Sequence, residues 1–231
     1  MDYKNKQLLR PILRGREIKA YFTNWDGSYL INVHNGLKNK YMMPIDINEY
    51  PFIRKHLDVF KNQLEKRDDQ GKTPYNLRNC AYLDEFAKEK IIWKRIGSQL
   101  IFSYSDEDIF SLDSTCIATG EKIKYLVAFL NSKLSKYQLF ESAPRTGMGD
   151  LIISVQALEP LFVYYPTSKE EKLFTQIIDQ ILSIIKHTDY TQNLQNQAKV
   201  KKLEKEIDQL VYKLYDLTPE EIKIVEGFGE K

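Results

Sequence analysis

The chain has 231 residues, 29% charged and 42% hydrophobic, which is typical of a globular protein that can bury one large core or two modest ones. Its 34 Lys and Arg nearly balance 32 Asp and Glu, and a net charge of +2 argues against a uniformly basic or acidic protein. The start of the chain is polar and the apolar runs are short, so we expect no signal peptide, no membrane span and a cytoplasmic location.

Charge is unevenly distributed along the chain. Residues 1–20 carry six Lys or Arg against two acids, and residues 54–95 carry eleven against seven. Residues 204–231 reverse this bias, with four Lys against eight acids. A basic face on a nearly neutral protein is compatible with nucleic-acid binding, although a solvated Lys-rich surface fits the charge pattern equally well.

The first 120 residues read as short strands and turns around one helix. Tyr29–Val33 has strand character, and Pro51 opens a helical pattern that continues to Leu64. Further strands are predicted over Lys90–Ile96, Leu100–Tyr104 and Ser114–Ala118.

The second half becomes progressively more helical. An apolar stripe predicts a helix over Lys124–Tyr137, and strands are expected at Ile152-Ile153 and Leu161–Tyr165. Ser168 and Glu171 have the spacing of a capping box at the start of a helix. A second helix carries Leu residues from Leu203 to Leu217, and Thr218 is placed to cap a third. We therefore predict an α+β fold with a mixed sheet and inserted helices over residues 1–166, followed by a helical hairpin over residues 167–231.

Motifs that carry catalysis are missing from the sequence. The histidines have no metal-ligand spacing, and neither a P-loop nor a nucleophile elbow occurs. Cys80 and Cys116 lie too far apart for a metal knuckle and favour a reducing compartment. Glu-x-Lys pairs at Glu170 and Glu221 fall at helix starts, where solvated charge is the simpler interpretation. We expect a binding module with no catalytic residue and no metal site.

The segment Leu64–Cys80, called the basic segment below, is the least scaffold-like part of the chain. It surrounds an Asp68-Asp69-Gln70-Gly71 turn with cations and adds an aromatic and an amide side chain. Arg can bond guanine in the major groove, Asn can bond adenine, and Lys and Tyr suit phosphate oxygens. Alternatively, the arginines pair with the acids of the turn and stiffen it. Its candidate DNA-binding residues are Arg67, Lys72, Tyr75, Asn76 and Arg78.

Several blocks in order resemble one family. LRPILRGREIKAY (Leu9–Tyr21), RDDQGKTPYNLR, KIIWKRI, DSTCIATG and YLVAFLNSKL are similar to blocks of the TaqI-like C-terminal specificity domain, and Leu203–Val225 looks like the helical tail of such proteins. These domains recognise the DNA target for adenine-specific methyltransferases and for restriction enzymes fused to them. The resemblance covers nearly the whole chain.

Further candidates come from turns and strands outside the basic segment. Arg14 and Arg16 flank Gly15, where they could clamp a phosphate or form an ordinary solvated turn. The resemblance places the loop of Arg145 and Thr146 near DNA, and Gln99 and Tyr104 lie on alternating strand positions that could face it.

The resemblance implies sequence-specific recognition of double-stranded DNA. The partner would be a methyltransferase domain, with a nuclease in fused enzymes, joined in cis or supplied as a separate subunit. S-adenosylmethionine, and Mg²⁺ where a nuclease is fused, would belong to those domains and not to this chain. Two alternatives stay open from the sequence: a helical protein-interaction scaffold and a Mg²⁺-dependent nuclease.

Overall fold

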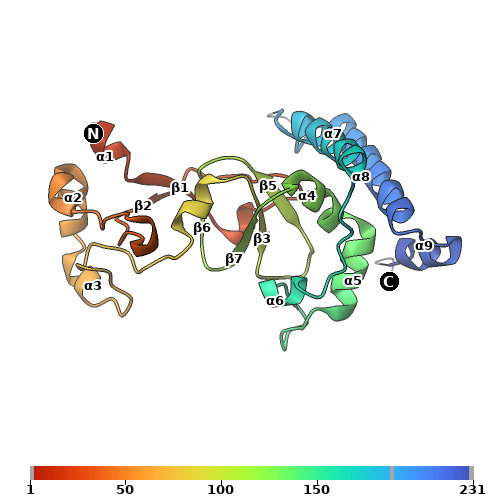
Figure 1. Ribbon diagram of the computed structural model, residues 1–231. Helices are drawn as coiled ribbons and strands as arrows, with labels where there is room; N and C mark the ends of the chain where they lie inside the picture. Colours follow the sequence, from red (N-terminus) through yellow and green to blue (C-terminus); the bar gives the residue numbers. More distant parts are fainter. Residues whose placement is uncertain (1–2, 188–189, 229–231) are drawn as a thin grey trace. The chain divides into compact units, whose positions relative to one another are not determined.

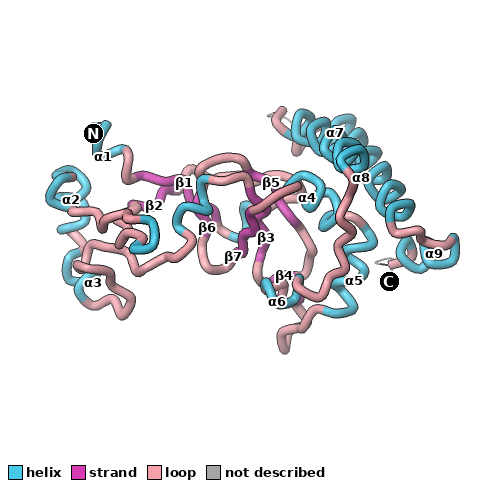
Figure 2. Tube along the Cα trace, in the orientation of Figure 1, coloured by secondary structure: helices cyan, strands magenta, loops and turns pink. Residues whose placement is uncertain are grey.

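The computed structural model describes residues 3–187 and 190–228, and the chain divides into two compact units (Figure 1). Unit 1 comprises Met1–Leu13, Trp25–Lys88 and Glu107–Phe110. Unit 2 comprises Arg14–Asn24, Glu89–Asp106 and Ser111–Lys231. Small sheets and many helices occur together along the chain, which confirms the predicted α+β class (Figure 2).

Unit 1 is built on a small antiparallel sheet. β1 (Leu9–Leu13) pairs with β2 (Tyr29–Ile31), and the strand order is β2-β1-β6, where β6 is Phe110–Ser111. α1 (Tyr3–Lys6) precedes the sheet. Hydrogen bonds in its loops add to a core of buried apolar side chains. One cluster of that core consists of Leu8, Val33, Ile47 and Ile53.

The helix predicted from Pro51 to Leu64 is divided into two. α2 spans Pro51–Asp58 and α3 spans Lys61–Glu65. Phe60 lies between them with φ −103° and ψ 11°, outside helical geometry, and its ring packs on His56. α3 buries none of its residues. Because packing of an apolar face supplies most helical stability, nothing in this unit holds the two pieces in one straight helix.

Unit 2 contains the larger sheet, in the order β5-β3-β7. β3 (Lys90–Lys94) is central and pairs antiparallel with both β5 (Phe102–Ser105) and β7 (Thr115–Thr119), which confirms the three strands expected here. A separate ribbon pairs β4 (Ile96–Gly97) with β8 (Leu151–Ile152). The indole Nε1 of Trp93 donates to the carbonyl of Ile153 at 2.8 Å, which ties the central strand to the end of the ribbon.

The helix expected over residues 124–137 is also two helices. α4 spans Ile123–Asn131 and α5 spans Lys133–Ser142. Asn131 turns its side chain to the backbone of Phe102 in β5, and the hydroxyl of Ser132 accepts the N–H of Ser135 as the cap of α5. Asp208 accepts the first backbone N–H of α5, that of Lys133, at 2.8 Å. The break exists because polar side chains give the backbone better partners than a continued helix would.

Long C-terminal helices share the core of the sheet. α7 (Ser168–Ile185) and α8 (Leu194–Leu214) pack on each other and on α4 and α5, and α9 (Pro219–Glu226) packs on α5. Their buried stripe includes Phe174, Ile178, Ile181, Ile207 and Val211. The predicted hairpin is therefore present, and its apolar face is used inside unit 2. The expected domain division at residue 166 stays a prediction.

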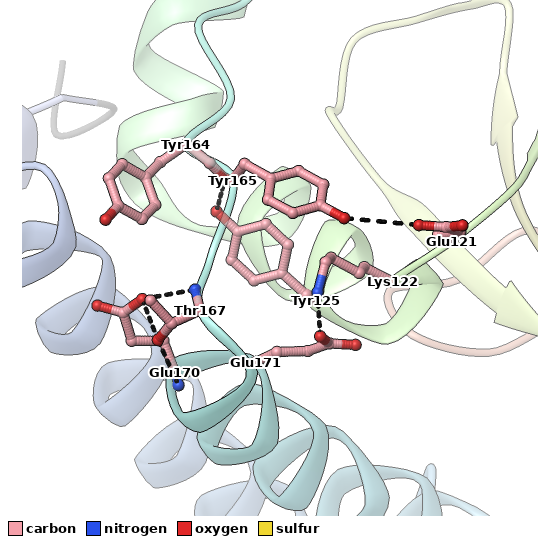
Figure 3. Close-up of polar contacts among 8 residues, drawn as sticks. All are labelled: Glu121, Lys122, Tyr125, Tyr164, Tyr165, Thr167, Glu170 and Glu171. Carbon is pink, nitrogen blue, oxygen red and sulfur yellow. Dashed lines mark hydrogen bonds and ion pairs between the residues drawn. The ribbon is translucent and has the colours of Figure 1, made fainter.

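Figure 3 shows how α7 begins. The capping box is formed by Thr167 and Glu170, one residue earlier than the predicted pair. This shift frees Glu171, which pairs with Lys122 instead. α9 begins with a second capping box, between Thr218 and Glu221, as its sequence predicted.

The strand predicted at Leu161–Tyr165 is wrong. After α6 (Val155–Leu158) this stretch has no regular structure, and tyrosine hydroxyls hold its backbone. Tyr125 donates to the carbonyl of Tyr164 at 2.7 Å, and Tyr215 accepts the N–H of Tyr164 and donates to the carbonyl of Phe162 (the first bond is drawn in Figure 3). The backbone of this apolar run therefore bonds to tyrosine side chains in place of a neighbouring strand.

Candidate nucleic-acid interface

The turn of the basic segment is fixed by its own polar side chains. Nη2 of Arg67 donates to the carbonyls of Pro74 and Asn76, each at 2.8 Å. Nε2 of Gln70 donates to the carbonyls of Glu65 and Arg67 at the end of α3. Arg67 thus pairs with backbone carbonyls in place of the acids of the turn. Both side chains have structural roles that the base-reading interpretation did not foresee.

Asn76 is the buried centre of unit 1's loops, with 1% of its surface exposed. Its amide nitrogen donates to the carbonyls of Ile45 at 3.0 Å and His34 at 3.3 Å. Its amide oxygen accepts the hydroxyl of Thr73 at 2.7 Å and the backbone N–H of the same residue at 3.2 Å. Both donors and the acceptor are used, so Asn76 has a structural role in this unit, and the expected adenine contact stays a prediction.

The remaining side chains of the basic segment are more accessible. The hydroxyl of Tyr75 donates to Asp58 at 2.5 Å, and this bond raises the pKa of Tyr75. Lys72 is exposed. Arg78 forms an ion pair with Asp69 at 3.1 Å, but the two side chains are 66% and 73% exposed. An exposed pair contributes only about 0–1 kcal/mol, so Arg78 can exchange Asp69 for a phosphate or a base.

The 34–45 hairpin, which the sequence did not mark as a site, lies against the basic segment. Its legs are joined where Ile45 N–H donates to the carbonyl of His34 at 3.0 Å, and Leu37 and Met42 bond each other nearer the tip. The carbonyl oxygen of the Asn35 side chain accepts the N–H of Lys72. In the sequence, this hairpin is marked only by Gly36, which adopts a positive φ, and by the Lys38-Asn39-Lys40 run. A glycine and two lysines occur in many ordinary turns, so these residues did not indicate a binding site.

In unit 2, Arg14 precedes a short 3-10 turn, Gly15–Glu17, and Arg16 lies within it. Glu17 is buried, accepts the backbone N–H of Arg14 at 2.9 Å, and approaches Nε of Arg16 at 3.5 Å. Both arginine side chains are exposed. The buried carboxylate therefore fixes the turn, while the guanidinium groups face solvent.

The loop of Arg145 and Thr146 is a tight turn that leads into β8. The N–H of Thr146 donates to the carbonyl of Asp150 at 2.8 Å, and Thr146 Oγ1 accepts the N–H of Asp150 at 3.1 Å. The guanidinium of Arg145 lies 4.2 Å from the ring centre of Phe140. Met148 at the tip is 95% exposed. β4 and β8 are antiparallel, so the end of β4 lies beside the start of β8. Gln99, which is exposed and follows β4, therefore lies at the same end of the ribbon as this loop.

Tyr104 and its neighbour Ser103 are parts of the core. The hydroxyl of Tyr104 donates to Glu89 at 2.8 Å, and burial with this bond raises its pKa. Ser103 donates to the carbonyls of Lys19 and Phe22. All four residues of β5 are buried, and the 18–23 stretch pairs with the strand at Ser103. Tyr104 therefore has a packing role in unit 2, and the expected DNA contact stays a prediction.

The carboxylates that could have suggested a nuclease are used as helix caps. Glu170 accepts the hydroxyl and N–H of Thr167, and Glu221 accepts the N–H and hydroxyl of Thr218. These bonds lower the pKa of both glutamates. Within residues 3–187 and 190–228, no three His, Cys, Asp or Glu side chains gather as metal ligands would.

Comparisons with known proteins identify the family. The model of the TaqI-like C-terminal specificity domain matches residues 10–161, about two thirds of the chain. The chain belongs to this family of specificity domains. No curated protein matches the sequence.

A solved structure described as the type IIG restriction endonuclease BpuSI is similar over 90% of this chain, with 13% identity and a TM-score of 0.47. The similar region covers 26% of that chain, so this protein spans about a quarter of its length. Among the described helices, none is long and apolar enough to cross a membrane.

Proposed function

We propose that this protein recognises a specific sequence in duplex DNA on behalf of a restriction–modification enzyme. Membership of the specificity-domain family supports the class of function. One observation supports assigning DNA recognition to particular surfaces of this chain. Exposed arginines lie on turns whose backbones are fixed by internal hydrogen bonds. These arginines are Arg14, Arg16, Arg78 and Arg145.

Fixed turns matter because ordering a loop on binding costs conformational entropy, which lowers affinity. The turns of Arg14 and Arg145 are closed by a carboxylate and a hydroxyl, and the basic segment is closed by Arg67 and Asn76. The exposed side chains on them can therefore contact phosphates and base edges at little ordering cost. Lys72 and Gln99 are further exposed candidates for these contacts.

The partner in this proposal is an adenine-specific methyltransferase domain, with a nuclease in a fused enzyme. Our chain would hold the duplex while that domain takes an adenine out of the base stack. S-adenosylmethionine and Mg²⁺ would bind to the partner domains. The helical scaffold is the weaker alternative, because the apolar stripes of α7 and α8 are buried in unit 2.

The proposal is tested by selecting bound sequences from a random duplex pool with the full chain, and then measuring affinity at several salt concentrations. We expect one recovered sequence and a steep fall in affinity as salt rises. Arg78→Ala should either lower affinity for all duplexes and reduce the salt slope by about one, as for a phosphate contact, or relax preference at one base pair.

Lys169→Ala is the matched control, since it removes an exposed cation from α7 without touching the fixed turns. It should leave affinity and the salt slope unchanged. Duplex binding that does not respond to salt between low and physiological concentrations would overturn the proposal. Equal binding to every duplex would instead leave a DNA-binding protein without the proposed specificity.

A further inference from the structure

Tyr41 is the most exposed of the described tyrosines of unit 1, and its backbone is held in place. It lies at the tip of the 34–45 hairpin with 95% of its surface exposed, and Met43 beside it is 75% exposed. Tyr41 has φ 55° and ψ 22°, the left-handed conformation that side chains other than glycine seldom adopt. Such a conformation persists only where the surrounding structure imposes it, and it recurs at binding sites.

The neck of the hairpin is held by buried groups. The amide of Asn76 donates to the carbonyls of His34 and Ile45, one on each leg. The N–H of Gly36 donates to Nδ1 of His34 at 3.1 Å. A Cβ on Gly36 would lie 2.3 Å from the carbonyl oxygen of Met42, so the two legs approach more closely than any other residue allows.

An exposed aromatic on a rigid support loses little entropy when it packs against a flat partner. The hairpin thus presents a ring on a backbone that is already ordered before binding.

Charge around Tyr41 indicates the kind of partner. Residues 35–45 contain Lys38 and Lys40 and no acidic residue. Lys38 is exposed, and Lys40 pairs with Asp84 in the same unit. An aromatic ring beside lysines matches nucleic acid, where a base offers a flat face and phosphates surround it. Lysines are depleted in protein–protein interfaces, so Lys38 and Lys40 favour a nucleic-acid partner over a protein partner.

We propose that Tyr41 packs on the base stack of bound duplex DNA and opens one base step, while the lysines of the hairpin contact the flanking phosphates. This inference rests on the proposed DNA-binding function and adds a residue to it. Side chains inserted at a base step unstack it and bend the duplex, and the cost depends on which step is opened. Tyr41 would thereby contribute to sequence preference without reading a base edge.

The test uses the full chain and the duplex recovered by selection, carrying 2-aminopurine at one position at a time. This base brightens when its stacking is lost. We expect the wild type to brighten it at one step and Tyr41→Ala to abolish the signal, with affinity lowered about 5- to 150-fold. Tyr41→Phe should retain both, because the ring and not the hydroxyl does the stacking.

Tyr3→Ala is the matched control, since Tyr3 is 80% exposed in the same unit but lies on α1. It should behave as the wild type does. If Tyr41→Ala binds and brightens the probe as the wild type does, the inference is overturned while DNA binding stands. If the wild type binds no duplex at all, the proposed function itself fails. An equal loss of affinity in Tyr41→Phe and Tyr41→Ala would make the hydroxyl a phosphate contact and overturn the stacking role.

Discussion

The basic segment and the 34–45 hairpin are neighbours in unit 1, and the structure of each differs from what its sequence suggests. The basic segment looks like a recognition loop, yet Arg67, Gln70 and Asn76 use their polar groups inside it or on the neck of the hairpin. The hairpin looks like an ordinary turn, yet it presents Tyr41 on a fixed backbone. Polar residues that resemble base readers can be the support for a neighbouring contact surface.

The largest effect is expected from Gly36→Ala at the neck of the hairpin. Gly36 has φ 77°, and the added Cβ would meet the backbone of Met42, Met43 and Pro44 at 2.3 to 2.9 Å. We expect unit 1 to lose about 3–5 kcal/mol of unfolding free energy, measured by hydrogen exchange of its amides. Gly27→Ala is the control: its φ is 89° with nothing within 4 Å, so about 1–2 kcal/mol should be lost. Equal losses would show that the close approach is unimportant.

Asn76→Ala should follow in size. It removes the amide donor from the carbonyls of His34 and Ile45 and the amide acceptor from the N–H of Thr73, which should cost on the order of 2–3 kcal/mol. Faster hydrogen exchange should appear in the hairpin as well as in the basic segment. Asn79→Ala removes only an exposed bond to Asn35 and should cost less than about 1 kcal/mol. A stable Asn76→Ala with altered DNA preference would restore the base-reading role.

Within the basic segment, we expect Arg67 to stabilise the loop and Arg78 to contact DNA. Arg67→Ala should destabilise unit 1 by about 1–3 kcal/mol, because two carbonyls lose a charged donor. Arg78→Ala should change stability by less than about 0.5 kcal/mol, since its partner Asp69 is exposed, while it weakens DNA binding. Denaturation and DNA affinity measured on both variants distinguish the stabilising residue from the residue that contacts DNA. The assignment fails if Arg67→Ala leaves stability intact.

The smallest effect is a pH dependence at His34. Burial, with Arg10 nearby, lowers the pKa of His34 below its ordinary value of 6.5, and its Nδ1 accepts the N–H of Gly36. The unfolded chain then binds the proton more readily, so this contribution is intact above pH 6.5 and is lost as pH falls through the window below it. Unit 1 should become less stable over that range by under about 1.4 kcal/mol for each unit of pKa depression. His34→Gln should flatten this part of the stability curve, and an unchanged slope in that variant would assign the dependence to other groups.

Local patterns in the sequence determined much of this protein. Strands over residues 90–94, 102–105 and 115–119, the two C-terminal helices and the cap at Thr218 followed from side-chain periodicity and capping chemistry. The family resemblance followed from blocks in order. These features depend on residues within a few positions of one another, and near neighbours are what a sequence records directly.

Only the tertiary structure decided which polar side chains are free. Asn76 reaches His34 and Ile45, Ser103 reaches Lys19, and Tyr215 reaches Phe162, all far away in sequence. A hydrogen bond needs its partner within about 3.5 Å, and no local pattern states which distant carbonyl will be there. A polar residue such as Asn76 can therefore be interpreted as a base contact from the sequence and yet stabilise a loop in the fold. Tyr41 is the converse case, an unremarked turn residue that distant support leaves exposed and fixed.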